Sequence, residues 1–274
     1  MSIPPLHSLV AAVMAGVGEP ELLVEGGASP HQTALRPSAA RNLARAGIVF
    51  WAGPELETFL HRALENLDPE IPVIALLHAP GVARLKPRTD HGHDHGEAAG
   101  VDPHFWLDPK NALRVTEVAA ETLGKTDPAN AAAYRENQAR VAARLQALDA
   151  ELEAALRPLS GRPFLVFHDS YAYLERRYGL GPAEAIAIDP ERSPGARRLA
   201  ELREKIREAQ VRCLFREPQF ASPIVARLRE GTELRIDTLD PLGSDLAPGP
   251  GLYEAMMRAN AAHLVRCLEG GKES

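Results

Sequence analysis

Three histidines stand alone in apolar, proline-marked segments of this 274-residue chain. They are His31 in GGASPHQ, His104 in VDPHFWLDP and His168 in FLVFHDSY. Imidazoles drawn from distant parts of a chain are ligands that suit a borderline-soft metal such as zinc. If the three rings converge, they bind Zn²⁺ through three nitrogens and leave a fourth position open. One such histidine alone is more often structural, so the prediction depends on the set.

Two acidic residues extend this predicted site. Asp240, in TLDPLGSD, follows an expected strand and is a candidate fourth ligand, with water as the alternative. A turn-forming aspartate before Pro241 would explain it equally simply. Glu217, in REPQF, is predicted to orient a ligating imidazole without touching the metal. Its alternative is a solvated surface carboxylate.

A second group of histidines, His91, His93 and His95, lies in TDHGHDHGEAAG, within an expected loop at 86–101. The run is too short and too interrupted by glycine to form a rigid tetrahedral site. We predict an auxiliary, low-affinity metal-collecting loop, and an incidental polar loop is the alternative.

Short apolar runs that alternate with helical patterns must position these residues. Such alternation predicts βαβ units and an α/β fold with mostly parallel sheets. Ligands gather at the carboxyl ends of parallel strands, where the histidines are expected. The predicted strands are Glu21–Val24, Ile48–Trp51, Val73–Leu76, Phe164–Phe167, Glu184–Ile188, Cys213–Phe215 and Leu234–Ile236.

One long helix, Pro128–Leu156, separates two such blocks. It is rich in strong helix formers and carries one apolar stripe at spacings of three and four. We therefore expect an N-terminal lobe at 1–127, a linking helix at 128–157 and a C-terminal lobe at 158–274. The alternative is a long surface helix within one domain. A shorter helix is expected after Asp108, which caps it, with Pro109 at its first position.

Composition narrows the possible partners. The formal net charge is −6, only 5% of the residues are aromatic, and no basic stripe occurs, which argues against nucleic acid. No run approaches ~18 apolar residues, so no membrane-spanning helix is expected. The N-terminal stretch lacks a basic start, and Pro4 and Pro5 interrupt it early; its apolar part, Leu9–Val17, suggests an amphipathic helix, not a cleavable signal. The chain is then cytosolic or a mature form without its leader.

The two cysteines, Cys213 and Cys267, leave two possibilities open. Two free thiols suit a cytosolic protein, and a disulfide suits an exported one.

Five ordered segments resemble the periplasmic solute-binding proteins of zinc ABC importers, within a class that also contains manganese receptors and adhesin-like lipoproteins. They are GASPHQTALRPS, DPHFWLDP, FLVFHDSYAYLERRYGL, FREPQF and TLDPLGSD, and the likeness runs from about Ser2 to Gly270. The resemblance implies two α/β lobes joined by one long rigid helix, with metal between them. By motif, it places the ligands on His31, His104, His168 and Asp240, and a disulfide on Cys213 and Cys267.

The function that the resemblance implies is high-affinity Zn²⁺ capture in the periplasm and delivery to an ABC permease. We expect no enzymatic activity, and a monomer is the default for a shuttle. Manganese-type relatives carry a carboxylate where His168 stands, which favours zinc here. The alternatives are a manganese or mixed-metal receptor and, less favoured, a zinc-dependent hydrolase, for which no H-E-x-x-H motif is present. Two features depart from the pattern: little of the first strand precedes SIPPLHSLV, and Pro30 stands where some zinc receptors have glutamate.

Overall fold

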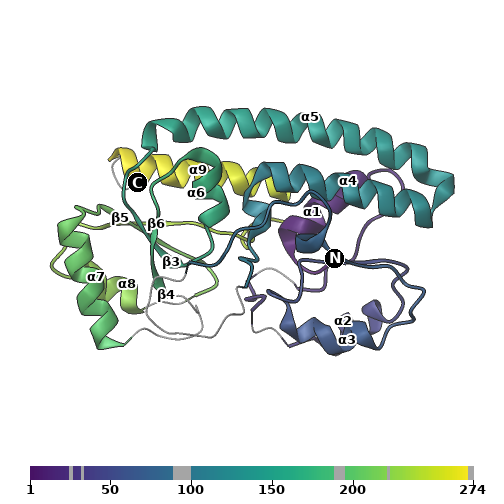
Figure 1. Ribbon diagram of the computed structural model, residues 1–274, viewed down its shortest axis with the longest axis horizontal. Coiled ribbons are helices and arrows are strands. Elements are labelled where there is room, and N and C mark those ends of the chain that lie inside the picture. The colour runs from purple at the N-terminus through teal and green to yellow at the C-terminus, as the bar shows by residue number, and fades with distance from the viewer. Residues whose placement is uncertain (25–26, 32–33, 89–99, 188–194, 221–222, 271–274) are drawn as a thin grey trace. The chain divides into compact units, whose positions relative to one another are not determined.

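The computed structural model describes residues 1–274 except 25–26, 32–33, 89–99, 188–194, 221–222 and 271–274 (Figure 1). The chain forms two compact units. The first is Met1–Asp149 with Leu242–Ala255, and the second is Ala150–Pro241 with Met256–Ser274. The expected lobes at 1–127 and 158–274 differ from this division, because 242–255 returns to the first unit. The chain therefore passes between the units more than once, not through the long helix alone.

The first unit is built around a fully buried helix. All ten residues of α1 (Pro4–Val13) are buried, and it packs against α4 (Pro109–Thr126). The expected amphipathic helix is therefore wrong, since a helix that is buried on all sides needs no polar face. Pro4 and Pro5 do not interrupt it. They open it, because the first turn of a helix has no use for the N–H that proline lacks.

A small parallel sheet completes the first unit. In it, β1 (Val49–Trp51) pairs with β2 (Val73–Ala75). The predicted strand Glu21–Val24 is wrong: two backbone hydrogen bonds, from Leu23 and Val24 to the first two residues, are too short a ladder for a regular strand. The remaining helices are α2 (Pro37–Leu43), η1 (Thr58–Leu60), α3 (His61–Glu65), η2 (Leu76–His78), η3 (Phe105–Leu107) and η4 (Pro128–Asn130).

The second unit contains a four-stranded parallel sheet in the order β4-β3-β5-β6. Each strand lies within two residues of a predicted run. The strands are β3 (Leu165–His168), β4 (Glu184–Ala187), β5 (Cys213–Arg216) and β6 (Arg235–Thr238). The helices of the unit are η5 (Arg157–Leu159), α6 (Ala172–Tyr178), α7 (Ala196–Glu208) and α8 (Pro223–Arg229), and most of α9 (Leu252–Glu269) also belongs to it.

Helices cover both faces of this sheet, which explains why every residue of the inner strand β3 is buried. Leu202 of α7 and Leu228 of α8 pack with Leu165 and Leu214 in one buried cluster. Figure 1 shows α6 and α9 on the opposite side of the sheet from α7 and α8. The predicted βαβ arrangement is confirmed for this unit.

The two predicted helix features are also confirmed. Asp108 caps α4 by accepting a hydrogen bond from the Lys110 backbone N–H at 2.9 Å, and Pro109 holds the first helical position. The long helix is α5 (Ala131–Leu156), about 39 Å at 1.5 Å per residue. Its predicted stripe is at most 2% exposed and comprises Val141, Leu145, Leu148, Leu152 and Leu156.

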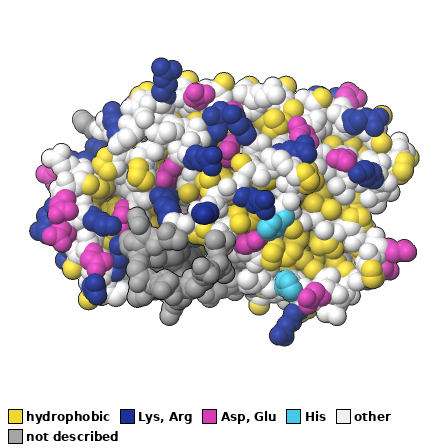
Figure 2. All heavy atoms as spheres, viewed as in Figure 1, with side chains coloured by type: hydrophobic (Ala, Val, Ile, Leu, Met, Phe, Trp, Pro, Cys, Tyr) yellow, Lys and Arg dark blue, Asp and Glu magenta, His cyan; other side chains and the backbone are white. Residues whose placement is uncertain are grey.

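The surface of the described residues carries mixed charges. On the face drawn in Figure 2, lysine and arginine side chains are interspersed with aspartate and glutamate. Within the described residues, no helix is both long and apolar enough to cross a membrane.

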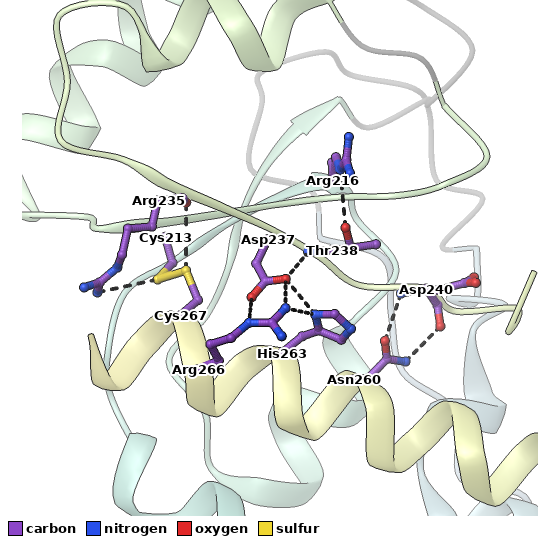
Figure 3. A network of polar contacts seen from close by, with 10 residues as sticks. All are labelled: Cys213, Arg216, Arg235, Asp237, Thr238, Asp240, Asn260, His263, Arg266 and Cys267. Carbon is purple, nitrogen blue, oxygen red and sulfur yellow. Dashed lines mark hydrogen bonds and ion pairs between the residues drawn. A yellow bond between two sulfur atoms is a disulfide. The ribbon is translucent and has the colours of Figure 1, made fainter. Parts of the chain in front are cut away.

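The predicted disulfide is present. Cys213 of β5 is bonded to Cys267 of α9, with Cα atoms 5.9 Å apart (Figure 3). Both residues are buried. The bond ties the last helix to the centre of the second sheet.

Replacing both cysteines with serine should lower the free energy of unfolding by about 4 kcal/mol, because the bond closes a loop with a sequence separation of 54 and restricts the unfolded chain. Urea unfolding followed by circular dichroism measures this loss. Wild-type protein in thiol reductant is the control and should match the variant. An unchanged unfolding midpoint in both samples would contradict the expectation.

Candidate metal centre

Two of the three predicted histidine ligands lie side by side in the first unit. The ring centroids of His31 and His104 are 5.5 Å apart, with an angle of 49° between the ring planes. His104 immediately precedes η3 and is 4% exposed, whereas His31 is half-buried. The structure therefore brings together two imidazoles that are 73 residues apart in the sequence, from His31 to His104.

A buried carboxylate fixes the ring of His104. The Oδ1 atom of Asp102 accepts hydrogen bonds from the His104 backbone N–H at 3.0 Å and from its ring Nδ1 at 2.8 Å. A ring that donates from Nδ1 keeps its lone pair on Nε2, which is the arrangement of a metal-ligating imidazole backed by a carboxylate. Asp102 was not among the site residues predicted from the sequence. The available signal was its position two residues before the histidine, where an aspartate can bond the backbone locally.

The third histidine lies in the second unit. His168 ends β3 and is 4% exposed. Glu217 Oε1 is 3.6 Å from His168 Nδ1, which is close enough for an ion pair but too long for a hydrogen bond. Ser170 donates its hydroxyl to the same carboxylate oxygen at 3.2 Å. Glu217 is 3% exposed, so it is not the solvated surface carboxylate that was the alternative.

Tyr171 is a buried phenol in the second unit, near two carboxylates of the predicted site. Burial, followed by the nearby charges of Glu217 and Asp240, raises the pKa of Tyr171 well above its ordinary value. The phenol therefore stays neutral beside them.

Asp240 is held at both its backbone and its side chain. It lies two residues beyond β6 and is half-buried. Gln219 Nε2 donates to its Oδ1 at 2.7 Å, and Asn260 bonds its backbone. These contacts fix an oxygen donor near the end of the sheet. Its role as the fourth ligand stays a prediction.

The predicted collecting loop cannot be placed. His91, His93 and His95 lie outside the described residues.

Comparison with known proteins identifies the family. The family model described as "Zinc-uptake complex component A periplasmic" matches residues 1–267. This chain belongs to the zinc-uptake component A family. The high-affinity zinc uptake system protein ZnuA of Brucella abortus is 40% identical to this family member, across 98% of the chain and 90% of the relative. The predicted resemblance is confirmed.

Solved structures share the architecture of this zinc-uptake component A member. A crystal structure of ZnuA has a TM-score of 0.84 at 26% identity and covers 97% of both chains. The binding protein FpvC of Pseudomonas aeruginosa, solved with Ni²⁺, has a TM-score of 0.82 at 26% identity, covering 100% of this chain and 97% of its own. The predicted fold class is therefore confirmed, and the same architecture occurs in a protein bound to a different metal.

Replacing Asp102 with alanine should weaken zinc binding by about 10–100-fold, because the His104 ring loses the partner that orients it. Asp102→Asn keeps an acceptor oxygen, so its zinc affinity should lie between those of the wild type and Asp102→Ala. Competition with a chromogenic chelator gives the affinities.

The matched control is Asp68→Ala. Asp68 also accepts a hydrogen bond from the backbone N–H two residues later, at Glu70, but on an exposed turn. Its loss should leave zinc affinity unchanged. Wild-type affinity in Asp102→Ala would show that His104 needs no such partner.

Proposed function

We propose that this chain captures Zn²⁺ with His31, His104 and His168, one ring nitrogen each, and delivers it to an ABC-type permease. The observation that carries the proposal is the His104–Asp102 pair beside His31 in the first unit. In the second unit a buried carboxylate, Glu217, lies 3.6 Å from the Nδ1 atom of the buried His168. Histidines that are oriented and kept from water are what a tight nitrogen site requires.

Zinc is the proposed ion because of the donor set. Three neutral imidazoles favour zinc over manganese, which prefers oxygen ligands. The zinc uptake named for the Brucella abortus relative supports this choice. Imidazole also suits nickel, and FpvC was solved with Ni²⁺, so the metal must be tested by competition.

The fourth position is assigned to Asp240, with water as the alternative. A carboxylate there would add charge to three neutral ligands and close the coordination sphere. A closed sphere suits capture, whereas hydrolysis needs an open position and a nearby base. We therefore propose a solute-binding role without catalysis.

The proposed location is the periplasm, where the chain acts as a monomer that carries its ion to the permease at the inner membrane. The family description names a periplasmic component, and the Cys213–Cys267 disulfide suits an oxidising compartment. Imidazoles bind metal in their deprotonated form, so acidification should favour release.

Removing any one of the three histidines should weaken zinc binding by more than about 100-fold, beyond the effect of losing a residue that only orients a ligand. The variants are His31→Ala, His104→Ala and His168→Ala, titrated with zinc against a competing chelator. In the same assay, wild-type protein should prefer zinc to manganese.

The control for these variants is His61→Ala, on α3, where the exposed His61 faces Glu65. It should bind zinc like the wild type. Near-native affinity in all three ligand variants would reject the proposed site.

Changing His91, His93 and His95 together to alanine should leave the tight site intact and remove only additional weak binding, because these residues are proposed as a collecting loop. Calorimetric titration with zinc separates the two classes by stoichiometry. Deletion of 91–95 tests the same point with a shorter loop. Loss of the tight site in the alanine variant would contradict this division of roles.

A further inference from the structure

Helix α9 holds the end of β6 through residues that recur once per turn. Asn260, His263 and Cys267 are spaced by three and four, which places them on one face of the helix. Figure 3 shows that this face lies along β6 and the segment after it. We call these contacts, with Arg266, the α9 ladder.

The C-terminal residues of the α9 ladder hold strand β6. Cys267 is bonded to Cys213, and Arg266 binds both oxygens of Asp237, at 2.9 and 2.6 Å. His263 Nδ1 lies 2.6 Å from Asp237 Oδ1. Burial alone would raise the pKa of Asp237, but the hydrogen bonds from Arg266 and His263 outweigh it and hold the pKa below its ordinary value. Asp237 therefore remains a charged anchor.

The first residue of the α9 ladder, Asn260, binds the backbone of Asp240. Asn260 is 2% exposed. Its Oδ1 accepts from the Asp240 backbone N–H at 2.8 Å, and its Nδ2 donates to the Asp240 carbonyl at 2.8 Å (Figure 3). A side-chain amide offers a donor and an acceptor side by side in this way. One side chain thus fixes the peptide groups on both sides of the Asp240 Cα.

Gln219 restrains the other end of the same residue. Its Nε2 donates to the Asp240 carboxylate at 2.7 Å and binds one of the two oxygens. With the backbone held by Asn260 and the carboxylate held by Gln219, the side chain has little freedom left. The ordering entropy of an oxygen ligand is then lost on folding and not when the ion binds.

We propose that Asn260 and Gln219 are positioning residues, which hold Asp240 ready as the oxygen ligand of the bound metal. This rests on the proposed zinc-capture function. Neither residue touches the ion; each acts through Asp240. Affinity should therefore depend on both of them only while Asp240 is present.

The test is a double-mutant cycle read by zinc affinity in chelator competition and by thermal unfolding. Asn260→Ala and Gln219→Ala should each weaken zinc binding by about tenfold. In an Asp240→Ala background, neither change should weaken zinc binding further, although Asn260→Ala should still lower the Tm.

Arg266→Ala is the matched control, because it breaks the ladder at Asp237 and leaves the Asn260 contacts in place. It should lower the Tm and change zinc affinity by less than about twofold, within the spread of effects at independent sites. Gln219→Ala, on a half-buried loop residue outside α9, keeps the inference testable if Asn260→Ala does not fold.

Three results would overturn the inference. Equal losses of affinity with and without Asp240 would mean that the two residues act on the fold in general. An Asp240→Ala variant with wild-type affinity would remove Asp240 from the site, while the histidine variants could still support zinc capture. Wild-type protein that binds no zinc would overturn the proposed function and this inference together.

Discussion

The candidate centre depends on imidazoles being aimed before any ion arrives. In the first unit, Asp102 accepts the Nδ1 hydrogen of His104 at 2.8 Å in a buried setting. In the second, Glu217 lies 3.6 Å behind His168. A histidine ring that rotates freely can present the wrong atom, and it loses entropy when it binds. A buried carboxylate that accepts the ring hydrogen, as Asp102 does for His104, removes both costs.

The fold supplies these pairs from local geometry at the ends of its elements. His168 ends a parallel strand, where side chains emerge from the sheet. His104 precedes a short helical turn and the Asp108-capped α4, so its backbone direction is fixed on both sides. The same logic extends to Asp240, which α9 holds just beyond β6.

Architecture and metal choice are separate properties among proteins that share this fold. The chain shares its fold with a ZnuA crystal structure and with FpvC bound to Ni²⁺, at similar TM-scores. The preference for one ion must therefore come from the donor atoms and their supports and not from the arrangement of helices and strands. The proposed donor set, three imidazoles with the Asp240 carboxylate, is one that the fold permits but does not dictate.

The sequence by itself predicted the candidate ligands. It determined the four strands of the second sheet and the Asp108–Pro109 helix start, because periodicity and capping are local. Family likeness added the disulfide pair. Only the tertiary structure showed that α1 is buried on all sides, that Glu21–Val24 forms no regular strand and that 242–255 joins the first unit. It also revealed how Gln219 and Asn260 hold Asp240. Such partners depend on which distant segments fold back beside each other, and that is a global outcome no local pattern encodes.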